Sequence, residues 1–211
     1  KRTLTPVENR VLATIEWVVQ RYHIDRNRIY LRGISMGGSG TLGIGMCHGG
    51  IFAALLAGVP AGTAHASYRL SNPPALGGRA GTVTDVPPVL VFFSQKDDWS
   101  KGMEEWLDVV NRGKLSVVAA WGPWGHANHY EMTNPAAYEY PWLAIRKNQA
   151  YPVFLDASSD DKYPGFKSDA PCQNGQINAY FRWNVLEDKP GRFAMELRLV
   201  QSRELDGAAD I

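Results

Sequence analysis

The sequence predicts an α/β protein with a mainly parallel sheet, followed by a smaller β-rich unit. Short apolar runs alternate with helical patterns through residues 1–149, and one glycine-rich turn joins a strand to a helix near residue 35. At about residue 150 the character changes, and a two-residue alternation appears over residues 177–185 and 193–199. Alternating strands and helices favour a parallel sheet covered on both faces, whereas a period of two indicates half-buried antiparallel strands. The predicted units are therefore residues 1–149 and 150–211.

An amphipathic helix is predicted over residues 6–22. Thr5 and Glu8 have the spacing of a capping box, and Pro6 occupies the first helical position. Apolar residues then recur at three- and four-residue steps: Val7, Val11, Ile15, Val18, Val19 and Tyr22.

Four apolar runs predict the strands of the sheet, at residues 28–34, 52–59, 89–94 and 115–121. Three helices are expected between and after them, over residues 36–47, over residues 100–112, and from Asn134-Pro135 to about Lys147. The order strand, sharp turn, helix around residue 35 is the part of this pattern that bears on function.

The β-rich unit shows alternating apolar and polar residues over 177–185 and again over 193–199, on either side of a turn at 188–191. With residues 153–155 this makes about three strands, which are too few to fold stably on their own. The unit is expected to pack on the first unit or to continue as a β-sandwich beyond residue 211.

The charge balance gives no reason to expect nucleic acid or a membrane surface as partner. The chain has 22 basic and 21 acidic residues, and 45% of its residues are hydrophobic. No apolar run approaches the ~18 to 20 residues that cross a bilayer. Cys47 and Cys172 are expected to be unpaired thiols. A small molecule or a polymer chain is the expected partner.

Ser35 lies in the pattern Gly33-Ile34-Ser35-Met36-Gly37, between the predicted strand and helix. A serine becomes a strong nucleophile when a base removes its proton and a tight strand-to-helix turn holds its oxygen clear of the sheet. Gly33 and Gly37 are expected to remove Cβ atoms that would clash where strand and helix cross. The N–H of Met36 is expected to face a developing oxyanion. The alternative is an ordinary serine in a glycine-rich turn.

The fifteen residues from Ile24 to Gly38 resemble the nucleophile region of the α/β-hydrolase superfamily. The likeness is to the branch of prolyl-oligopeptidase-like peptidases and polysaccharide-associated esterases, and it covers roughly residues 6–147. It implies the later strands of a three-layer α/β-hydrolase sheet, with a small β-sandwich-like unit attached. It also implies that no cofactor is needed.

That family orders its catalytic residues as serine, acid and histidine. The position of the acid matches Asp97, with Asp98 as the alternative and a helix-capping or solvated loop role as the non-catalytic interpretation. The family's glycine-histidine pair after the last strand matches Gly125-His126, 29 residues past Asp97. His129 is the alternative base or a substrate contact.

Trp99, Trp121 and Trp124 flank the expected acid and base. They are predicted either to line a cleft that stacks on sugar or aromatic groups, or to form a hydrophobic cover over the sheet edge. The pair His126 and His129 lacks convincing further ligands nearby, so no metal is expected. The other histidines are interpreted as surface or packing residues: His23, His48 and His65.

The family's sheet begins well before the nucleophile strand, and an early loop there supplies a second oxyanion donor. Only 34 residues precede Ser35, so the resemblance implies an upstream segment on the same polypeptide or on another chain. The expected function is a serine hydrolase that cleaves a carboxylic ester through an acyl-enzyme, with carbohydrate-linked esters as candidates. Alternatives are a prolyl-oligopeptidase-like peptidase and a catalytically silent carbohydrate-binding module. A secreted or periplasmic location is favoured over the cytoplasm.

Overall fold

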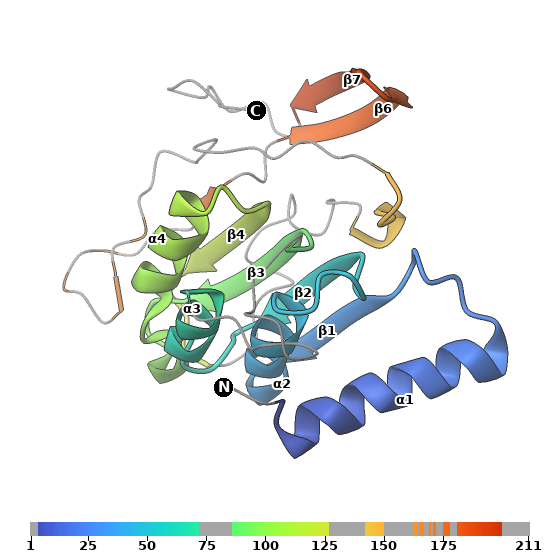
Figure 1. Cartoon of the computed structure of the whole chain (residues 1–211). Coiled ribbons are helices and arrows are strands. Elements are labelled where there is room, and N and C mark those ends of the chain that lie inside the picture. The colour runs from blue at the N-terminus through green and yellow to red at the C-terminus, as the bar shows by residue number, and fades with distance from the viewer. Residues whose placement is uncertain are drawn as a thin grey trace.

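The chain folds around a five-stranded sheet with the strand order β1-β2-β3-β4-β5 (Figure 1). The structure is a computed structural model that describes residues 4–71, 86–126, 142–149, 163, 165–166, 169, 171, 175–177 and 181–199. Four strands are parallel: β1 (Tyr30–Ile34), β2 (Ala54–Gly58), β3 (Val89–Ser94) and β4 (Val117–Gly122). The fifth, β5 (Gly175–Ile177), pairs antiparallel with β4. A separate antiparallel pair consists of β6 (Phe181–Lys189) and β7 (Arg192–Leu199).

The main helices are α1 (Pro6–Tyr22), α2 (Met36–Gly40), α3 (Ala64–Ser71) and α4 (Met103–Arg112). Three of them connect consecutive parallel strands, and each new strand is added on the same side of the previous one. Right-handed connections then place α2, α3 and α4 on one face of the sheet (Figure 1). Shorter helical turns are η1 (Thr41–Gly45), η2 (Asp98–Ser100) and η3 (Trp142–Ala144).

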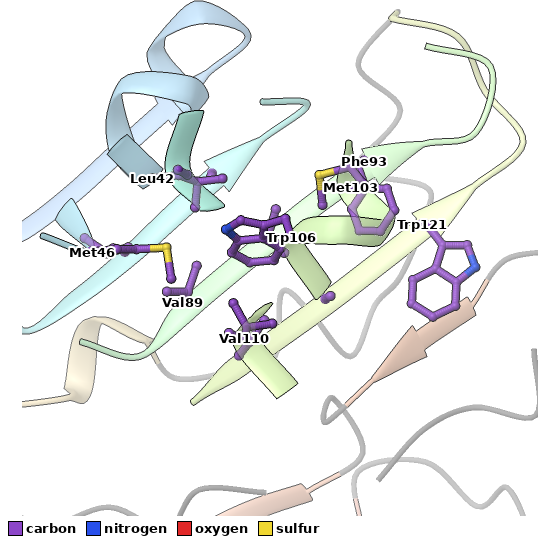
Figure 2. Close-up of a cluster of buried hydrophobic side chains, with 14 of the residues drawn as sticks. Leu42, Met46, Val89, Phe93, Met103, Trp106, Val110 and Trp121 are labelled. Atoms are coloured by element: carbon purple, nitrogen blue, oxygen red, sulfur yellow. The ribbon is translucent and has the colours of Figure 1, made fainter. Parts of the chain in front are cut away.

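The core lies on both faces of the sheet. All residues of β3 and β4 are buried, and alternate side chains belong to two clusters: Val89 and Phe93 to one, Leu90 and Phe92 to the other. On the helical face, α4 contributes the fully buried Trp106 (Figure 2). Truncation of such a tryptophan to alanine costs about 3–5 kcal/mol.

Several predicted elements agree with the structure. The helix over residues 6–22 is confirmed, with both hydrogen bonds of the Thr5 and Glu8 capping box, and so is the strand over 89–94. The other three predicted strands are confirmed with ends shifted by one or two residues. The predicted helix over 100–112 begins later, at Met103, because Gly102 adopts φ +90° and separates it from η2.

The helix predicted over residues 36–47 is divided. It is α-helical only over α2 and continues as the π-helical turn η1. Glycines occupy five of the ten positions from Met36 to Gly45, so this segment has little intrinsic preference for the α-helix. The pattern did not predict α3 at all.

The helix predicted to reach Lys147 is wrong over its described part. Residues 142–144 form one 3₁₀ turn, and residues 145–149 are not helical. Their backbone bonds to the edge of the sheet instead: the Tyr30 hydroxyl donates to the carbonyls of Leu143 at 2.6 Å and Ile145 at 2.8 Å, and the Lys147 N–H donates to the Asn27 carbonyl. Residues 134–141 lie outside the described part.

The predicted strand over residues 177–185 is two strands. β5 joins the edge of the main sheet, where Ile177 pairs with Ala119, and β6 begins separately at Phe181. The division into units at residue 150 stays a prediction, and residues 153–155 and Cys172 lie outside the described part. None of the described helices is long and apolar enough to cross a membrane.

Candidate active site

Three residues with catalytic chemistry follow three parallel strands at the same edge of the sheet. Ser35 follows β1, Asp97 lies three residues after β3, and His126 lies four residues after β4. The carboxyl ends of parallel strands meet at one edge, where ligands bind in open α/β sheets. The topology therefore gathers residues that are up to 91 positions apart.

Ser35 has an unusual backbone conformation, with φ +59° and ψ −122°. A positive φ costs a residue with a side chain of order 1–3 kcal/mol, so the surrounding structure must hold it. Two hydrogen bonds do so: the Ser35 N–H donates to the Gly58 carbonyl at 2.9 Å, and the Ser35 carbonyl accepts the Ser39 N–H at 3.0 Å. The turn thus carries strain at the residue whose hydroxyl is presented.

The close approach of strand and helix depends on Gly33 and Gly38. A Cβ at Gly33 would lie 2.0 Å from the Gly37 carbonyl oxygen, and one at Gly38 would lie 2.7 Å from the Gly58 carbonyl oxygen. The expectation for Gly37 is wrong, because a Cβ there would meet nothing within 4 Å. The backbone of Gly37, rather than a missing side chain, makes the contact.

The three side chains form one hydrogen-bonded line. The Ser35 Oγ lies 2.9 Å from His126 Nε2, and His126 Nδ1 lies 2.8 Å from Asp97 Oδ2. Since a carboxylate only accepts, Nδ1 carries the proton in this network and Nε2 is free to accept from the serine hydroxyl. The Asp97 side chain is 1% exposed, and its Oδ1 accepts the Trp99 N–H at 3.0 Å. The imidazole is thereby held in the tautomer that a general base requires.

Residues 9–72, just under a third of the chain, match the model of the prolyl oligopeptidase family. This segment contains the strand, the Ser35 turn and the helix that follows it. The parallel sheet with helices between its strands fits the α/β-hydrolase fold that the sequence predicts.

Similar solved structures include the Staphylococcus aureus S-formylglutathione hydrolase FrmB, with 17% identity, a TM-score of 0.43, and coverage of 58% of this chain and 55% of that one. The S. aureus fluorophosphonate-binding serine hydrolase F (FphF) has 17% identity and a TM-score of 0.45, covering 64% and 62%. The Pyrococcus horikoshii acylaminoacyl peptidase has 18% identity and a TM-score of 0.41, covering 57% and 23%. The chain thus spans 55–62% of the length of the first two. No curated protein matches it significantly.

Of the two neighbouring aspartates, Asp97 bonds to the imidazole. Asp98 is exposed and begins the short helix η2. Asp97 both bonds to the imidazole and caps a helix, since one of its oxygens contacts His126 and the other caps η2. His129 lies outside the described residues.

Met36 begins the helix that follows the nucleophile turn. Its N–H is the first of α2, and such a group has no acceptor within its own helix. The Met36 side chain is 74% exposed beside Ser35. The backbone N–H directly after the serine is the expected first donor to an oxyanion.

The three tryptophans have different environments. Trp99 is half-buried, and its ring lies 4.8 Å from the His126 ring between centroids. Trp124 is also half-buried, and its ring covers Gly122, where a Cβ would lie 1.5 Å from Cζ3. Trp121 is 2% exposed and packs in the core (Figure 2), so it lines no cleft. Trp99 thus contacts a residue of the hydrogen-bonded line.

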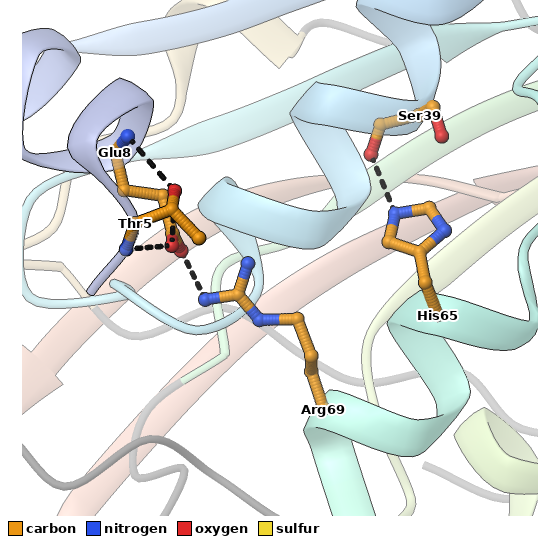
Figure 3. A network of polar contacts seen from close by, with 5 residues as sticks. All are labelled: Thr5, Glu8, Ser39, His65 and Arg69. Atoms are coloured by element: carbon orange, nitrogen blue, oxygen red, sulfur yellow. Dashed lines mark hydrogen bonds and ion pairs between the residues drawn. The ribbon is translucent and has the colours of Figure 1, made fainter. Parts of the chain in front are cut away.

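A buried polar cluster beside α2 is not indicated by the sequence pattern. Glu8 on α1 and Arg69 on α3 form an ion pair (Figure 3), and the exposed fraction is 4% for Glu8 and 8% for Arg69. Burial raises the pKa of Glu8, but hydrogen bonds from the Thr5 backbone N–H, Arg69 and the Thr5 hydroxyl outweigh burial, and the net pKa is lowered. Burial lowers the pKa of nearby His48. Glu8 was read only as a capping residue.

Among the residues that the structure describes, no three His, Cys, Asp or Glu side chains gather as metal ligands would.

Proposed function

We propose that the protein is a serine hydrolase that cleaves a carboxylic ester. The observation that carries this proposal is the continuous line from Asp97 through His126 to Ser35, with contacts of 2.8 and 2.9 Å. His126 Nε2 takes the hydroxyl proton as Ser35 Oγ attacks the carbonyl carbon, and Asp97 stabilises the resulting imidazolium. The N–H of Met36 donates to the oxyanion.

The acyl-enzyme forms when the tetrahedral intermediate collapses. The bond between the carbonyl carbon and the leaving oxygen breaks, and His126 returns its proton to that oxygen, which departs as an alcohol. Water then attacks the acyl carbon with His126 again as base, and Ser35 regains its proton as the acid product leaves. No cofactor enters either half of this cycle.

Trp99 supports an ester of a planar or sugar-like alcohol. Its half-buried ring lies against His126, the residue that protonates the leaving group in the proposed mechanism. A flat indole surface at this place offers stacking to a sugar face or an aromatic ring. Carbohydrate-linked esters are therefore the favoured substrates, and Trp124, which is also half-buried, is a further candidate contact.

A peptidase is the second candidate, because residues 9–72 match the prolyl oligopeptidase family. Turnover of p-nitrophenyl acetate and feruloyl esters, compared with aminoacyl-arylamides, distinguishes the two. Higher kcat/KM on the esters supports the proposal, and higher kcat/KM on the arylamides supports the peptidase.

The direct test is labelling of the full-length protein with a fluorophosphonate probe, which reacts with activated serines. The wild type and a Ser71→Ala control, altered at an exposed serine at the end of α3, are expected to label equally, and Ser35→Ala is expected not to label. Equal labelling of wild type and Ser35→Ala contradicts the assignment. A folded wild type that takes no label favours the silent binding module.

A further inference from the structure

His65, at the start of α3, bridges two carbonyl oxygens that belong to different elements. Its Nδ1 lies 2.7 Å from the Gly62 carbonyl oxygen. Its Nε2 lies 3.1 Å from the Ser39 carbonyl oxygen, a contact drawn in Figure 3. Gly62 belongs to the loop after β2, whereas Ser39 belongs to α2, the helix that begins directly after the nucleophile. A neutral imidazole carries one N–H, so His65 connects to α2 in the tautomer with its proton on Nε2, which donates to the Ser39 carbonyl.

Ser39 makes the same connection a second time. Its hydroxyl donates to the Ala61 carbonyl at 2.7 Å, and its N–H donates to the carbonyl of Ser35 at 3.0 Å. One residue of α2 is thus bonded both to the nucleophile and to the loop after β2. The hydrogen bond from the Ser39 hydroxyl to Ala61 and the contact between His65 and the Ser39 carbonyl together fix the distance between α2 and the loop after β2.

The structure leaves room for the imidazole at Gly43, in the π-helical turn η1. A Cβ at Gly43 would lie 2.8 Å from His65 Nε2 and 3.1 Å from its Cδ2. The ring is therefore packed closely against the backbone of this turn, and π-helical turns often occur at functional sites. This close approach is independent of the hydrogen bonds of His65.

From Gly62 the connection continues to the proposed acid and base. The Gly62 N–H donates to the Trp99 carbonyl at 2.9 Å, and the Trp99 N–H donates to Asp97 Oδ1 at 3.0 Å. The Trp99 ring lies against the His126 ring, with centroids 4.8 Å apart. The loop after β2 therefore contacts the segment from Asp97 to Trp99, whose tryptophan packs against His126.

Arg69 anchors the helix from which His65 projects. It lies one turn after His65 on α3, and it reaches the buried carboxylate of Glu8 on α1 (Figure 3). Residues four apart share a helix face, so one face of α3 contacts both α1 and α2.

We propose that His65 is a positioning residue for the hydrolysis proposed above, on which this inference rests. It holds the loop after β2 against α2 and so sets the position, relative to Ser35, of the segment from Asp97 to Trp99, which packs against His126. A misplacement of about 1 Å between reacting groups can cost about 100-fold in rate. Loss of His65 therefore lowers kcat and the rate of acylation while KM changes little, because His65 acts through its contacts with Gly62, Ser39 and Gly43 rather than on the substrate.

The test uses full-length His65→Leu and His65→Gln, with His23→Asn as a matched control at an exposed histidine on α1's C-cap. His65→Leu is expected to lower kcat and the fluorophosphonate labelling rate by about 10- to 100-fold, with KM within about threefold. His65→Gln is expected to recover part of this loss, since its amide N–H can donate to the Ser39 carbonyl. His65 is exposed, so its substitution is expected to leave the thermal unfolding midpoint nearly unchanged.

Ser39→Ala provides a second route to the same connection if His65→Leu fails to fold. It removes the hydrogen bond to Ala61 without altering His65, and a fall in kcat of a few-fold at unchanged KM is expected. If wild type labels and all these variants label at its rate, His65 has no positioning role although the proposed function stands. If wild type itself takes no label, the proposed function fails and this inference fails with it.

Discussion

Replacement of Arg69 by methionine leaves a buried carboxylate without its charged partner. The Glu8 side chain is 5% exposed and accepts hydrogen bonds from the Thr5 N–H at 2.9 Å, from the Thr5 hydroxyl at 2.8 Å, and from Arg69. Arg69→Met removes one donor of the three and the only cation among them. Breaking a buried pair on one side costs about 3–5 kcal/mol. We expect the low end of that range, because both Thr5 donors remain.

Urea unfolding measures this loss. A destabilisation of about 3 kcal/mol lowers the urea midpoint by about 1.5 M at an m-value of about 2 kcal/mol/M. The double variant Glu8→Gln and Arg69→Met removes both charges and is expected to lie within about 1 kcal/mol of the wild type, because a neutral pair of similar volume often replaces a buried ion pair without loss. A free energy of unfolding lowered by less than about 1 kcal/mol in Arg69→Met, or a double variant as unstable as Arg69→Met, would contradict this role of the buried ion pair.

Gly33→Ala places a Cβ 2.0 Å from the Gly37 carbonyl oxygen, so the backbone must shift. The free energy of unfolding is expected to fall by about 1–3 kcal/mol, and fluorophosphonate labelling is expected to be slower. A variant as stable as wild type would contradict the close packing at Gly33. Asp97→Asn keeps an acceptor for the Trp99 N–H but no longer fixes the imidazole tautomer, so kcat on an ester is expected to fall by about 10³- to 10⁴-fold with the fold retained. Burial lowers the pKa of His48 below 6.5. As the pH falls below 6.5, His48 is protonated in the unfolded chain before it is protonated in the folded one, so the free energy of unfolding declines. His48→Gln is expected to lack this part of the decline between pH 7.5 and 5.5, and an unchanged decline would assign it to other groups.

Glu8 contributes to pH dependence in a lower window. Hydrogen bonds from Thr5 and Arg69 outweigh burial and keep its pKa below the ordinary 4.5. Its stabilisation is therefore present above about pH 4.5 and is lost as the pH falls through the lower pKa of the folded state.

The strands and the nucleophile turn were predictable because their signals are local. A buried strand such as β3 is a continuous apolar run, and the turn at Ser35 needs a small residue at Gly33 whatever the rest of the chain does. The choice of Asp97 and His126 came from the resemblance. The parallel topology then explains why residues so far apart in sequence meet at one edge.

The tertiary contacts were not predictable from local pattern. Arg69 and Glu8 lie 61 positions apart, and nothing in the eight-residue α3 marks an arginine as buried. The mistake at Gly37 has a similar cause, since which glycine faces the crossing strand depends on the angle between helix and strand. His65 contacts carbonyl oxygens of other elements, and backbone acceptors carry no sequence signal.

The central claim is that Ser35 is an activated nucleophile. Peptide mass mapping of the full-length protein after fluorophosphonate treatment tests it most directly, because it identifies the residue that carries the adduct. A single adduct is expected on the peptide that contains Ser35, and it is expected to be absent when the protein is denatured before treatment. An adduct on another residue of the native protein, with Ser35 unmodified, would contradict it.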